Sequence, residues 1–370
     1  MILESHGDAC RLGYMRPLAC LLEDNIPKSF DFLASILYDV VKSVEDLEAL
    51  TYRPIGLVTR YVNARNYVTL AAELEFIDRK DQVIGRFGKL YLSIDSSSKF
   101  KKFVEGKAAL TLTDLITLTT AEKIFFLWVI LTKDYPFIQS IISWAVERER
   151  FTRQEAMNYA MEEAYPQSLR KISSKLDKRR RESLLKEIEE AEKFREKRLS
   201  MESKIEWIKS SQYAKYRHIA PPRLEWLVDC GVLRRSGRGK YELDQEYARD
   251  PEKLLKLASM KPGKLERFLF GEFIKSSLKA FSAADRSLIL KTLIEVYSRV
   301  TEYFGERVNL NLLEYLTAIV LVERGRIADL KTIHDSFNSL ALKFPDKVYV
   351  APGGEGGVSL AYINVEEIEI

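Results

Sequence analysis

The chain has 370 residues, of which 46% are hydrophobic and 30% charged. That length indicates about two to four domains, and that composition excludes a disordered polymer. A net charge of +4 is too small to identify a nucleic-acid-binding protein by itself. The distribution says more: residues 1–50 hold four basic and nine acidic residues, whereas residues 204–240 hold nine basic and three acidic ones.

The cysteines and histidines argue against a disulfide framework or a metal centre. Cys10, Cys20 and Cys230 do not have the spacing of a zinc site, and the chain contains only three histidines. The longest apolar run, 124–131, is far shorter than a membrane span, and no apolar segment typical of a signal peptide lies near the N-terminus. We therefore expect a cytoplasmic protein with no cofactor and no membrane contact. The many Lys, Arg and Glu residues beside few Gln are typical of thermophiles.

The first region, 1–100, reads as helices followed by a hairpin. Apolar residues recur at helical spacing over 30–41, and a shorter helix is expected over 44–50. A third helix is expected over 55–77, divided near residues 63–66. Alternation around turn residues then predicts a β-hairpin over 79–93.

The second region, 110–250, begins with three expected helices over 121–131, 136–147 and 152–164. Thr119 or Thr120 would cap the first helix, Thr152 would cap the third, and Pro166 would end the series.

The segment 168–209 is dense in charge and has a thin apolar stripe at helical spacing. We expect a long exposed helix or a helical hairpin inserted into the second region. Its stripe could pair with a second copy as a coiled coil, giving a homodimer, or the segment could bridge to a protein partner. The alternative is a solvated helix with internal Glu–Lys pairs.

The stretch 221–243 is the most informative part of the sequence. Pro221 and Pro222 open an expected helix with Leu224, Leu227 and Val228 on its core face, and Gly231 ends it. A basic hairpin follows at once over 234–243. A helix followed directly by a small ribbon resembles the end of a winged-helix domain. In that family, the helix and the ribbon usually contact DNA.

The third region, 251–370, has the same layout. Helices are expected over 254–258, 265–281, 284–304, 310–322 and 327–342, with Ser282 capping the third of them and Gly305 closing it. Two alternating strands around a glycine-rich tip end the chain. The resemblance therefore implies a mainly α fold with small β-hairpins, made of tandem winged-helix units, the central one carrying the charged insertion.

The basic residues of the second region are the strongest candidates for contact with double-stranded DNA. Guanidinium groups bind phosphate or the guanine edge, and a helix N-terminus offers free N–H groups. The candidates are Arg217, His218 and Arg223 near the expected helix start, and Arg234, Arg235, Arg238 and Lys240 in the ribbon. The alternative is a solvated hairpin.

The first and third regions differ in what their charges favour. In the first region the candidates are Arg60, Tyr61, Arg65 and Asn66 near the helix start and Arg86 and Lys89 in the hairpin, diluted by acidic neighbours. Residues 341–370 hold two basic and five acidic residues, with Glu355 at the expected tip, so phosphate would be repelled. We expect the third unit to be structural or to bind a protein or a second copy.

Enzyme signatures are poor, and no catalytic or metal-binding residue is assigned. No phosphate-binding Walker A sequence is present, and residues 190–193, Glu-Ala-Glu-Lys, resemble a nuclease string only in a helical context. We expect a DNA-binding protein acting in transcription regulation, replication initiation or a larger DNA-processing or defence assembly. In its tandem winged-helix units, the chain also resembles archaeal initiator-type proteins. The alternatives are a winged-helix interaction subunit of a chromosome-organising complex and, less favoured, a nuclease with an unrecognised site.

Overall fold

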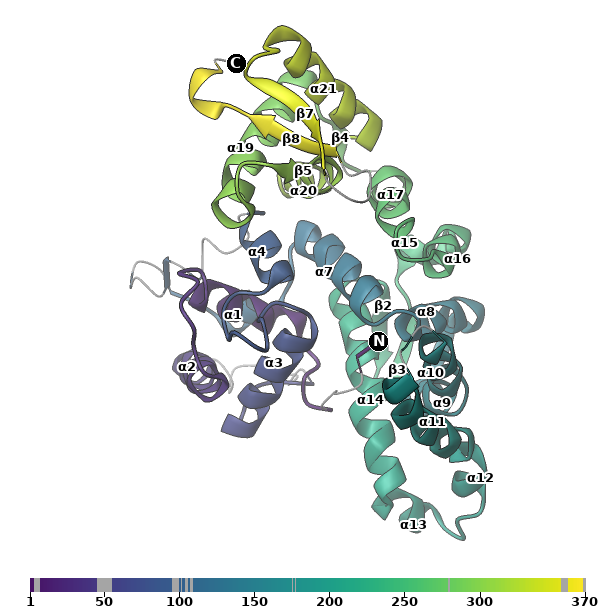
Figure 1. Cartoon of the computed structure of the whole chain (residues 1–370). Coiled ribbons are helices and arrows are strands. Elements are labelled where there is room, and N and C mark those ends of the chain that lie inside the picture. The colour runs from purple at the N-terminus through teal and green to yellow at the C-terminus, as the bar shows by residue number, and fades with distance from the viewer. Residues whose placement is uncertain are drawn as a thin grey trace.

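The computed structural model shows a mainly helical chain with small β-sheets. It describes all residues except 3–6, 45–54, 95–99, 101, 104–105, 107–108, 175, 177, 279, 354–358 and 369–370, and the side chains of 179, 180 and 183. Figure 1 shows an N-terminal part at lower left, a central part at lower right and a C-terminal part at the top.

The elements of the N-terminal part are helices, joined by loops and one short antiparallel bridge. Its elements are η1 (Leu12–Tyr14), α1 (Met15–Leu21), α2 (Phe30–Ser43), α3 (Tyr61–Glu73) and α4 (Arg86–Leu92). The sequence correctly predicts α2, which begins where the Ser29 side chain accepts a hydrogen bond from the backbone N–H of Phe32. The short helix expected over 44–50 lies almost entirely outside the described residues.

Two predictions for this part are wrong. The helix α3 is not divided near residues 63–66 but runs without a break. The hairpin expected over 79–93 is reduced to one antiparallel bridge between Ile77 and Ile84, and the residues after it form α4. The alternation of apolar and polar residues predicted strands, but Phe87, Leu90 and Tyr91 also have helical spacing, and all three are buried.

The central part orders its elements as helix, strand, helix, helix, strand, strand. They are α8 (Phe137–Arg148), β1 (Arg150–Thr152), a helical stretch of α9 (Arg153–Tyr159), the π turn η2 (Ala160–Ala164) and α10 (Tyr165–Ser173), then α14 (Ser211–Asp229), β2 (Leu233–Gly237) and β3 (Lys240–Leu243). The strands form an antiparallel sheet in the order β1–β3–β2. The predicted ribbon is confirmed.

Two proline predictions in the central part are wrong. Pro166 does not end the helical series, because α10 continues through it after the π turn. Pro221 and Pro222 do not open a helix but lie inside α14, which begins ten residues earlier at Ser211. Arg217, His218 and Arg223 are therefore in the interior of a helix rather than at its N-terminus, where backbone N–H groups would be free.

The segment expected over 168–209 begins with a helical hairpin, one of the two forms expected, made of α10 and α11 (Lys178–Glu192). The shorter helices α12 (Phe194–Leu199) and α13 (Lys204–Lys209) follow. The stripe residues Leu184, Ile188 and Ala191 are buried, and α11 packs on α10 of the same chain. This part of the stripe is therefore not available for a coiled coil with a second copy.

The C-terminal part repeats the element order of the central part. Four helices connect the two parts: α15 (Gln245–Ala248), α16 (Pro251–Ser259), α17 (Leu265–Phe268) and α18 (Ile274–Ser277), with the π turn η3 (Leu269–Phe273) between α17 and α18. The repeated elements are α19 (Arg286–Phe304), β5 (Val308–Asn309), α20 (Leu310–Glu323), α21 (Leu330–Lys343), β7 (Val348–Pro352) and β8 (Ser359–Ile363). The sheet order is β5–β8–β7. Two-residue strands β4 (Ser282–Ala283) and β6 (Arg326–Ile327) pair in parallel, and η4 (Val365–Glu367) follows β8.

Of the two caps predicted for α19, the one at the C-terminus is confirmed and the one at the N-terminus is wrong. The cap is Asp285, whose carboxylate accepts from the N–H of Leu288, and not Ser282, which lies in β4. Gly305 ends the helix with a φ of +78°, as predicted.

The centre of the molecule is built around α7 (Thr120–Lys133), which is capped by Thr119 as predicted. Its rings pack on those of the N-terminal part, with Phe76 and Phe126 stacked at 5.6 Å between centroids. The segment Leu112–Lys133, which joins the short helix α6 (Leu112–Ile116) to α7, has a mean hydropathy of 1.6 and passes a length test for a membrane span. Two thirds of that apolar window is buried, which is typical of a core helix.

Candidate nucleic-acid interface

The ribbon of β2 and β3 presents two faces with different partners. On one face Glu242 lies between two arginines, with Arg234 at 2.6 Å and Arg150 at 3.1 Å. On the other face Arg235 and Tyr241 turn toward α14. Alternation along the strands therefore divides the predicted arginines, because neighbouring side chains point to opposite faces of a sheet.

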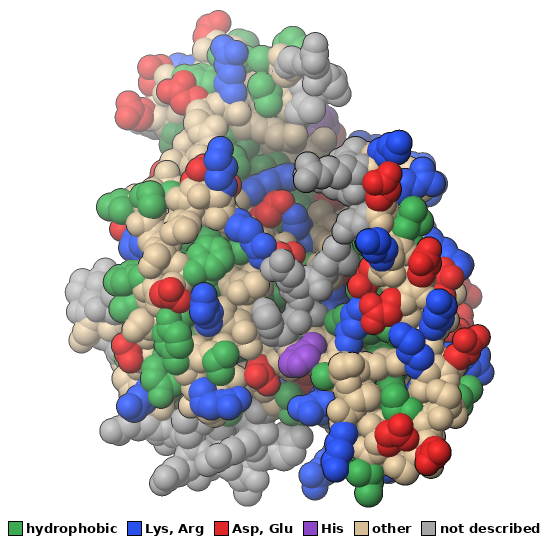
Figure 2. Space-filling view, turned by 60° about the horizontal axis from the view of Figure 1, so that its bottom comes forward, with side chains coloured by type: hydrophobic (Ala, Val, Ile, Leu, Met, Phe, Trp, Pro, Cys, Tyr) green, Lys and Arg blue, Asp and Glu red, His purple; other side chains and the backbone are tan. Residues whose placement is uncertain are grey.

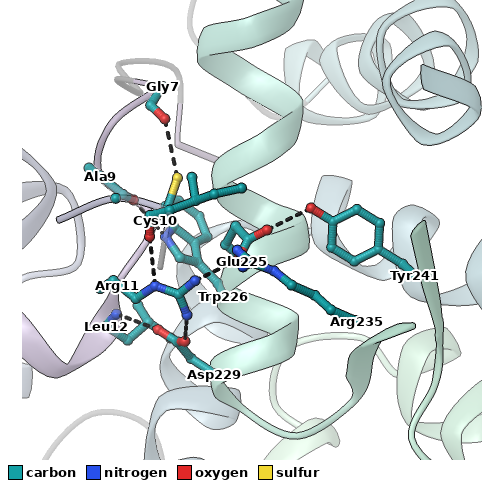
Figure 3. A network of polar contacts seen from close by, with 12 residues as sticks. Gly7, Ala9, Cys10, Arg11, Leu12, Glu225, Trp226, Asp229, Arg235 and Tyr241 are labelled. Carbon is teal, nitrogen blue, oxygen red and sulfur yellow. Dashed lines mark hydrogen bonds and ion pairs between the residues drawn. The ribbon is translucent and has the colours of Figure 1, made fainter. Parts of the chain in front are cut away.

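A buried polar network joins α14 and the ribbon to the N-terminal segment (Figure 3). Glu225 is fully buried; it accepts hydrogen bonds from Arg11 at 2.7 Å and Tyr241 at 2.6 Å, and it pairs with Arg235. Asp229 pairs with Arg11 and accepts from the N–H of Leu12 at 2.8 Å. Two guanidinium groups thus face two carboxylates, and the charges of the network balance.

The carboxyl group of Asp229 titrates unusually in this network. Burial raises the pKa of Asp229 to about 6, and the charge of Arg11 acts in the opposite direction. Burial also raises the pKa of the Tyr241 phenol, aided by the neighbouring charge of Glu225. The phenol therefore stays a hydrogen-bond donor to Glu225.

The second half of α14 is covered by the beginning of the chain. The Trp226 indole donates to the carbonyl of Ala9 at 2.9 Å. Arg223 is fully buried; it pairs with Asp134 at 2.6 Å and donates to the carbonyl of Ile2 at 2.8 Å. Arg223 is therefore a structural residue, and its assignment as a DNA contact is wrong.

Arg217 and His218 lie on the first half of α14 and are exposed. The ring Nδ1 of His218 accepts from the backbone N–H of Gly7 at 2.9 Å. A Cβ at Gly7 would come within 2.8 Å of the Arg217 carbonyl, so the N-terminal segment approaches α14 as closely as a glycine allows.

A pocket with a volume of about 560 Å³ opens between the ribbon and the N-terminal part. It is lined by Ile55, Arg153, Arg235, Arg238, Gly239 and Tyr241. Arg153, which the sequence did not single out, begins α9 and lies outside the basic stretch 204–240. The structure brings it to the ribbon because its backbone N–H donates to the carbonyl of Gly239 at 2.8 Å.

Of the ribbon residues, Arg238 and Lys240 are exposed and make no ion pair with any residue that the structure describes. The Arg234 side chain is 43% exposed but forms an ion pair with Glu242, which also pairs with Arg150. The Arg235 side chain is 17% exposed and forms an ion pair with Glu225. The predicted group of three arginines and one lysine in the ribbon therefore consists of two open cations, Arg238 and Lys240, and two paired ones.

The candidate residues on α3 form a second open surface. Arg60, Tyr61 and Arg65 are exposed near the start of the helix, and Asn66 is half-buried. Asp31 of α2 accepts from the Tyr61 hydroxyl at 3.2 Å and lies 3.6 Å from the Arg65 guanidinium. An acidic neighbour therefore weakens the positive field here, as the sequence indicated.

Arg86 and Lys89 do not join either surface. Both belong to α4, which lies on the side of the N-terminal part facing α19 (Figure 1). Lys89 is half-buried, and the Arg86 guanidinium lies 5.7 Å from the Phe87 ring. Their assignment to a DNA-binding hairpin is wrong because that hairpin is a helix.

Figure 2 shows a face of the molecule on which basic side chains lie on both sides of a hollow, mixed with acidic ones. Among the described residues, no group of three or more His, Cys, Asp or Glu side chains could hold a metal ion. No family model, curated protein or solved structure matches this chain.

Proposed function

We propose that this chain is a winged-helix protein that binds double-stranded DNA. The central and C-terminal parts each follow the order helix, strand, helix, helix, strand, strand, with the first strand pairing the third. This order and pairing are those expected of a winged-helix fold, and they support the proposal. The N-terminal part offers less support, since it has α3 and a single bridge between Ile77 and Ile84. Fold alone does not specify a function.

The observation that carries the proposal is the pair of open cations at the ribbon. Arg238, in the turn between β2 and β3, and Lys240, at the start of β3, are exposed and have no acidic partner among the described residues. Phosphate contacts by such groups release counterions and supply most of the nonspecific affinity for DNA. Arg217 on the exposed half of α14 and Arg60 and Arg65 on α3 would add weaker contacts.

This mode differs from the usual one, because the second half of the third helix is buried and cannot enter a major groove. The ribbon would make the main contact, and the contact would be to phosphate more than to bases. A role in transcription, replication initiation or a larger DNA-processing or defence assembly fits such a module, with the sequence preference supplied elsewhere.

The test is fluorescence anisotropy of a labelled duplex at low salt with the double variant Arg238→Gln/Lys240→Gln. We expect about tenfold weaker binding, because two phosphate contacts are lost. The matched control is Lys331→Gln/Lys343→Gln, which removes two exposed lysines of α21 and should bind like the wild type. Undetectable binding of the wild-type chain at low salt would refute the proposal.

A second candidate function is that of a protein-binding subunit, as in chromosome-organising complexes. Exposed apolar side chains on the C-terminal unit favour it: Leu342 of α21 is 84% exposed, and Tyr349 and Val350 of β7 are 38% and 42% exposed. The tip of the insertion also exposes Leu199, Ile205 and Ile208. Absence of duplex binding together with an association that Leu342→Asp abolishes in light scattering would favour this function. Cleavage of the duplex with Mg²⁺ would favour a nuclease instead.

A further inference from the structure

The pocket beside the ribbon carries a charge that the protein itself does not neutralise. Three of the described residues that line it are arginines, Arg153, Arg235 and Arg238. Arg235 is bound to Glu225, within the balanced network that also contains Arg11 and Asp229. Arg153 and Arg238 have no acidic partner among the described residues, so the pocket keeps two positive charges.

One of these arginines also has an unused buried donor. The Nε atom of Arg153 is buried and makes no hydrogen bond with any residue that the structure describes. A buried donor without an acceptor is energetically costly, so such groups usually have a partner. Arg153 is among the residues that line the pocket, so an anion bound there would face its guanidinium group.

The position of Arg153 is fixed by the fold. It follows β1 directly, where Thr152 pairs with Lys240, and its backbone N–H is bound to Gly239. The Gly239 position, with a φ of +67°, turns the ribbon at the edge of the pocket. Arg153 therefore lies where β1 passes into α9 and Arg238 lies in the turn of the ribbon, and the pairing of β1 with β3 brings both residues to the pocket.

The walls of the pocket are suited to a small organic anion. Ile55 and the Tyr241 ring, which stacks on Phe151 at 6.0 Å, add apolar and aromatic surface to the arginines. A volume of about 560 Å³ exceeds what inorganic phosphate needs and lies within the usual range of small-ligand sites, roughly 300–1,000 Å³. Guanidinium groups bind phosphate through paired, charge-assisted hydrogen bonds.

We propose that this pocket binds a phosphate monoester, with Arg153 and Arg238 as its direct ligands and Arg235 held beside them by Glu225. The ester is either a free nucleotide or the 5′-phosphate at the end of a DNA strand, and both present the same group. This site goes beyond the proposed duplex binding, because it recognises a single terminal phosphate in a pocket rather than a backbone along a surface.

The experiment is calorimetric titration of the full chain with AMP, with adenosine and with short duplexes that carry either a 5′-phosphate or a 5′-hydroxyl. Adenosine should give no binding. Preference for the phosphorylated duplex over the 5′-hydroxyl duplex identifies the strand end as the source, and binding of AMP without that preference identifies a free nucleotide. No binding of AMP together with no preference between the duplexes would overturn the proposal.

The variant Arg153→Gln should weaken whichever phosphate ligand binds by about tenfold or more, the effect of losing a charge-assisted hydrogen bond. The matched control Arg150→Gln removes the same charge three residues away, from a side chain that is 83% exposed and outside the pocket, and should change affinity less than about twofold. Equal weakening by both variants would overturn the proposal. If Arg153→Gln does not fold, Arg238→Gln on the exposed ribbon takes its place.

The two proposals fail separately. Titration with AMP uses no DNA, so undetectable duplex binding by the wild-type chain, which would refute the proposed function, leaves the pocket result standing. Failure of AMP and of the strand-end preference leaves backbone binding by Arg238 and Lys240 untouched.

Discussion

The central and C-terminal parts place the same six elements in the same order, yet their third helices have opposite surroundings. Residues 219–227 of α14 are all buried, held by Arg223, Glu225 and Trp226 against the start of the chain. The outer face of α21 is open, with Lys331, Leu342 and Lys343 exposed. One topology thus provides a structural helix in one unit and a free surface in the other, so the topology does not decide which surface binds a partner.

The largest expected effect tests the structural role of α14. Replacing Arg223 by Ala leaves Asp134 as an uncompensated buried charge and should lower the free energy of unfolding by about 3–5 kcal/mol in urea denaturation. Lys331→Ala, on the corresponding helix of the C-terminal unit, should change it by less than about 0.5 kcal/mol. A loss below about 1 kcal/mol for Arg223→Ala would show that α14 is less constrained than the contacts indicate.

A smaller effect is expected where the N-terminal segment crosses α14. Gly7→Ala places a Cβ at 2.8 Å from the Arg217 carbonyl, and overpacking of this kind should cost about 1–3 kcal/mol in the same assay. At Gly271 the nearest neighbour of an added Cβ would be 3.7 Å away, so Gly271→Ala should be neutral or slightly stabilising. Equal effects of the two changes would contradict the close contact at Gly7.

The pH dependence of stability tests the buried network. The pKa of Asp229 is about 6 in the folded chain and 3.8 as its ordinary value, so the folded state holds this proton more tightly. The stabilisation that comes from the raised pKa of Asp229 is therefore complete below about pH 4 and is lost as the pH rises through about 6. The difference in unfolding free energy between wild type and Asp229→Asn should fall over that range. A difference that grows with pH would mean that pairing with Arg11 outweighs burial.

The smallest effect is expected on the open helix. Leu342 is 84% exposed, so Leu342→Ser removes little buried surface and should change the free energy of unfolding by less than about 0.5 kcal/mol. A larger loss in urea denaturation at dilute concentration would show that this side chain is covered by something other than solvent, such as a second copy.

The sequence predicted local features well. The central ribbon, the C-terminal strands, and the caps Thr119 and Thr152 all depend on residues close together in the chain, whose patterns are specific. The start of α14 was missed because Pro221 and Pro222 usually mark a boundary, and here tertiary packing keeps them inside a helix.

The candidate site was harder to predict because its pairings span long separations. Arg223 looked like a DNA contact, but its partner Asp134 is 89 residues away. Glu225 and Asp229 are two of the three acidic residues in the basic stretch 204–240, and their partner Arg11 lies more than 200 residues earlier. Arg153 carried no pattern of its own, and only the pairing of β1 with β3 brings it to the ribbon.

The most direct test of ribbon-led DNA binding is the salt dependence of duplex affinity for the wild type and for Arg238→Gln/Lys240→Gln. If these two side chains contact phosphates, the slope of log affinity against log salt should become less negative by about two in the double variant, because about one counterion is released per contact. The Lys331→Gln/Lys343→Gln control should keep the wild-type slope. An unchanged slope in the ribbon variant, or an equal change in the control, would contradict the account.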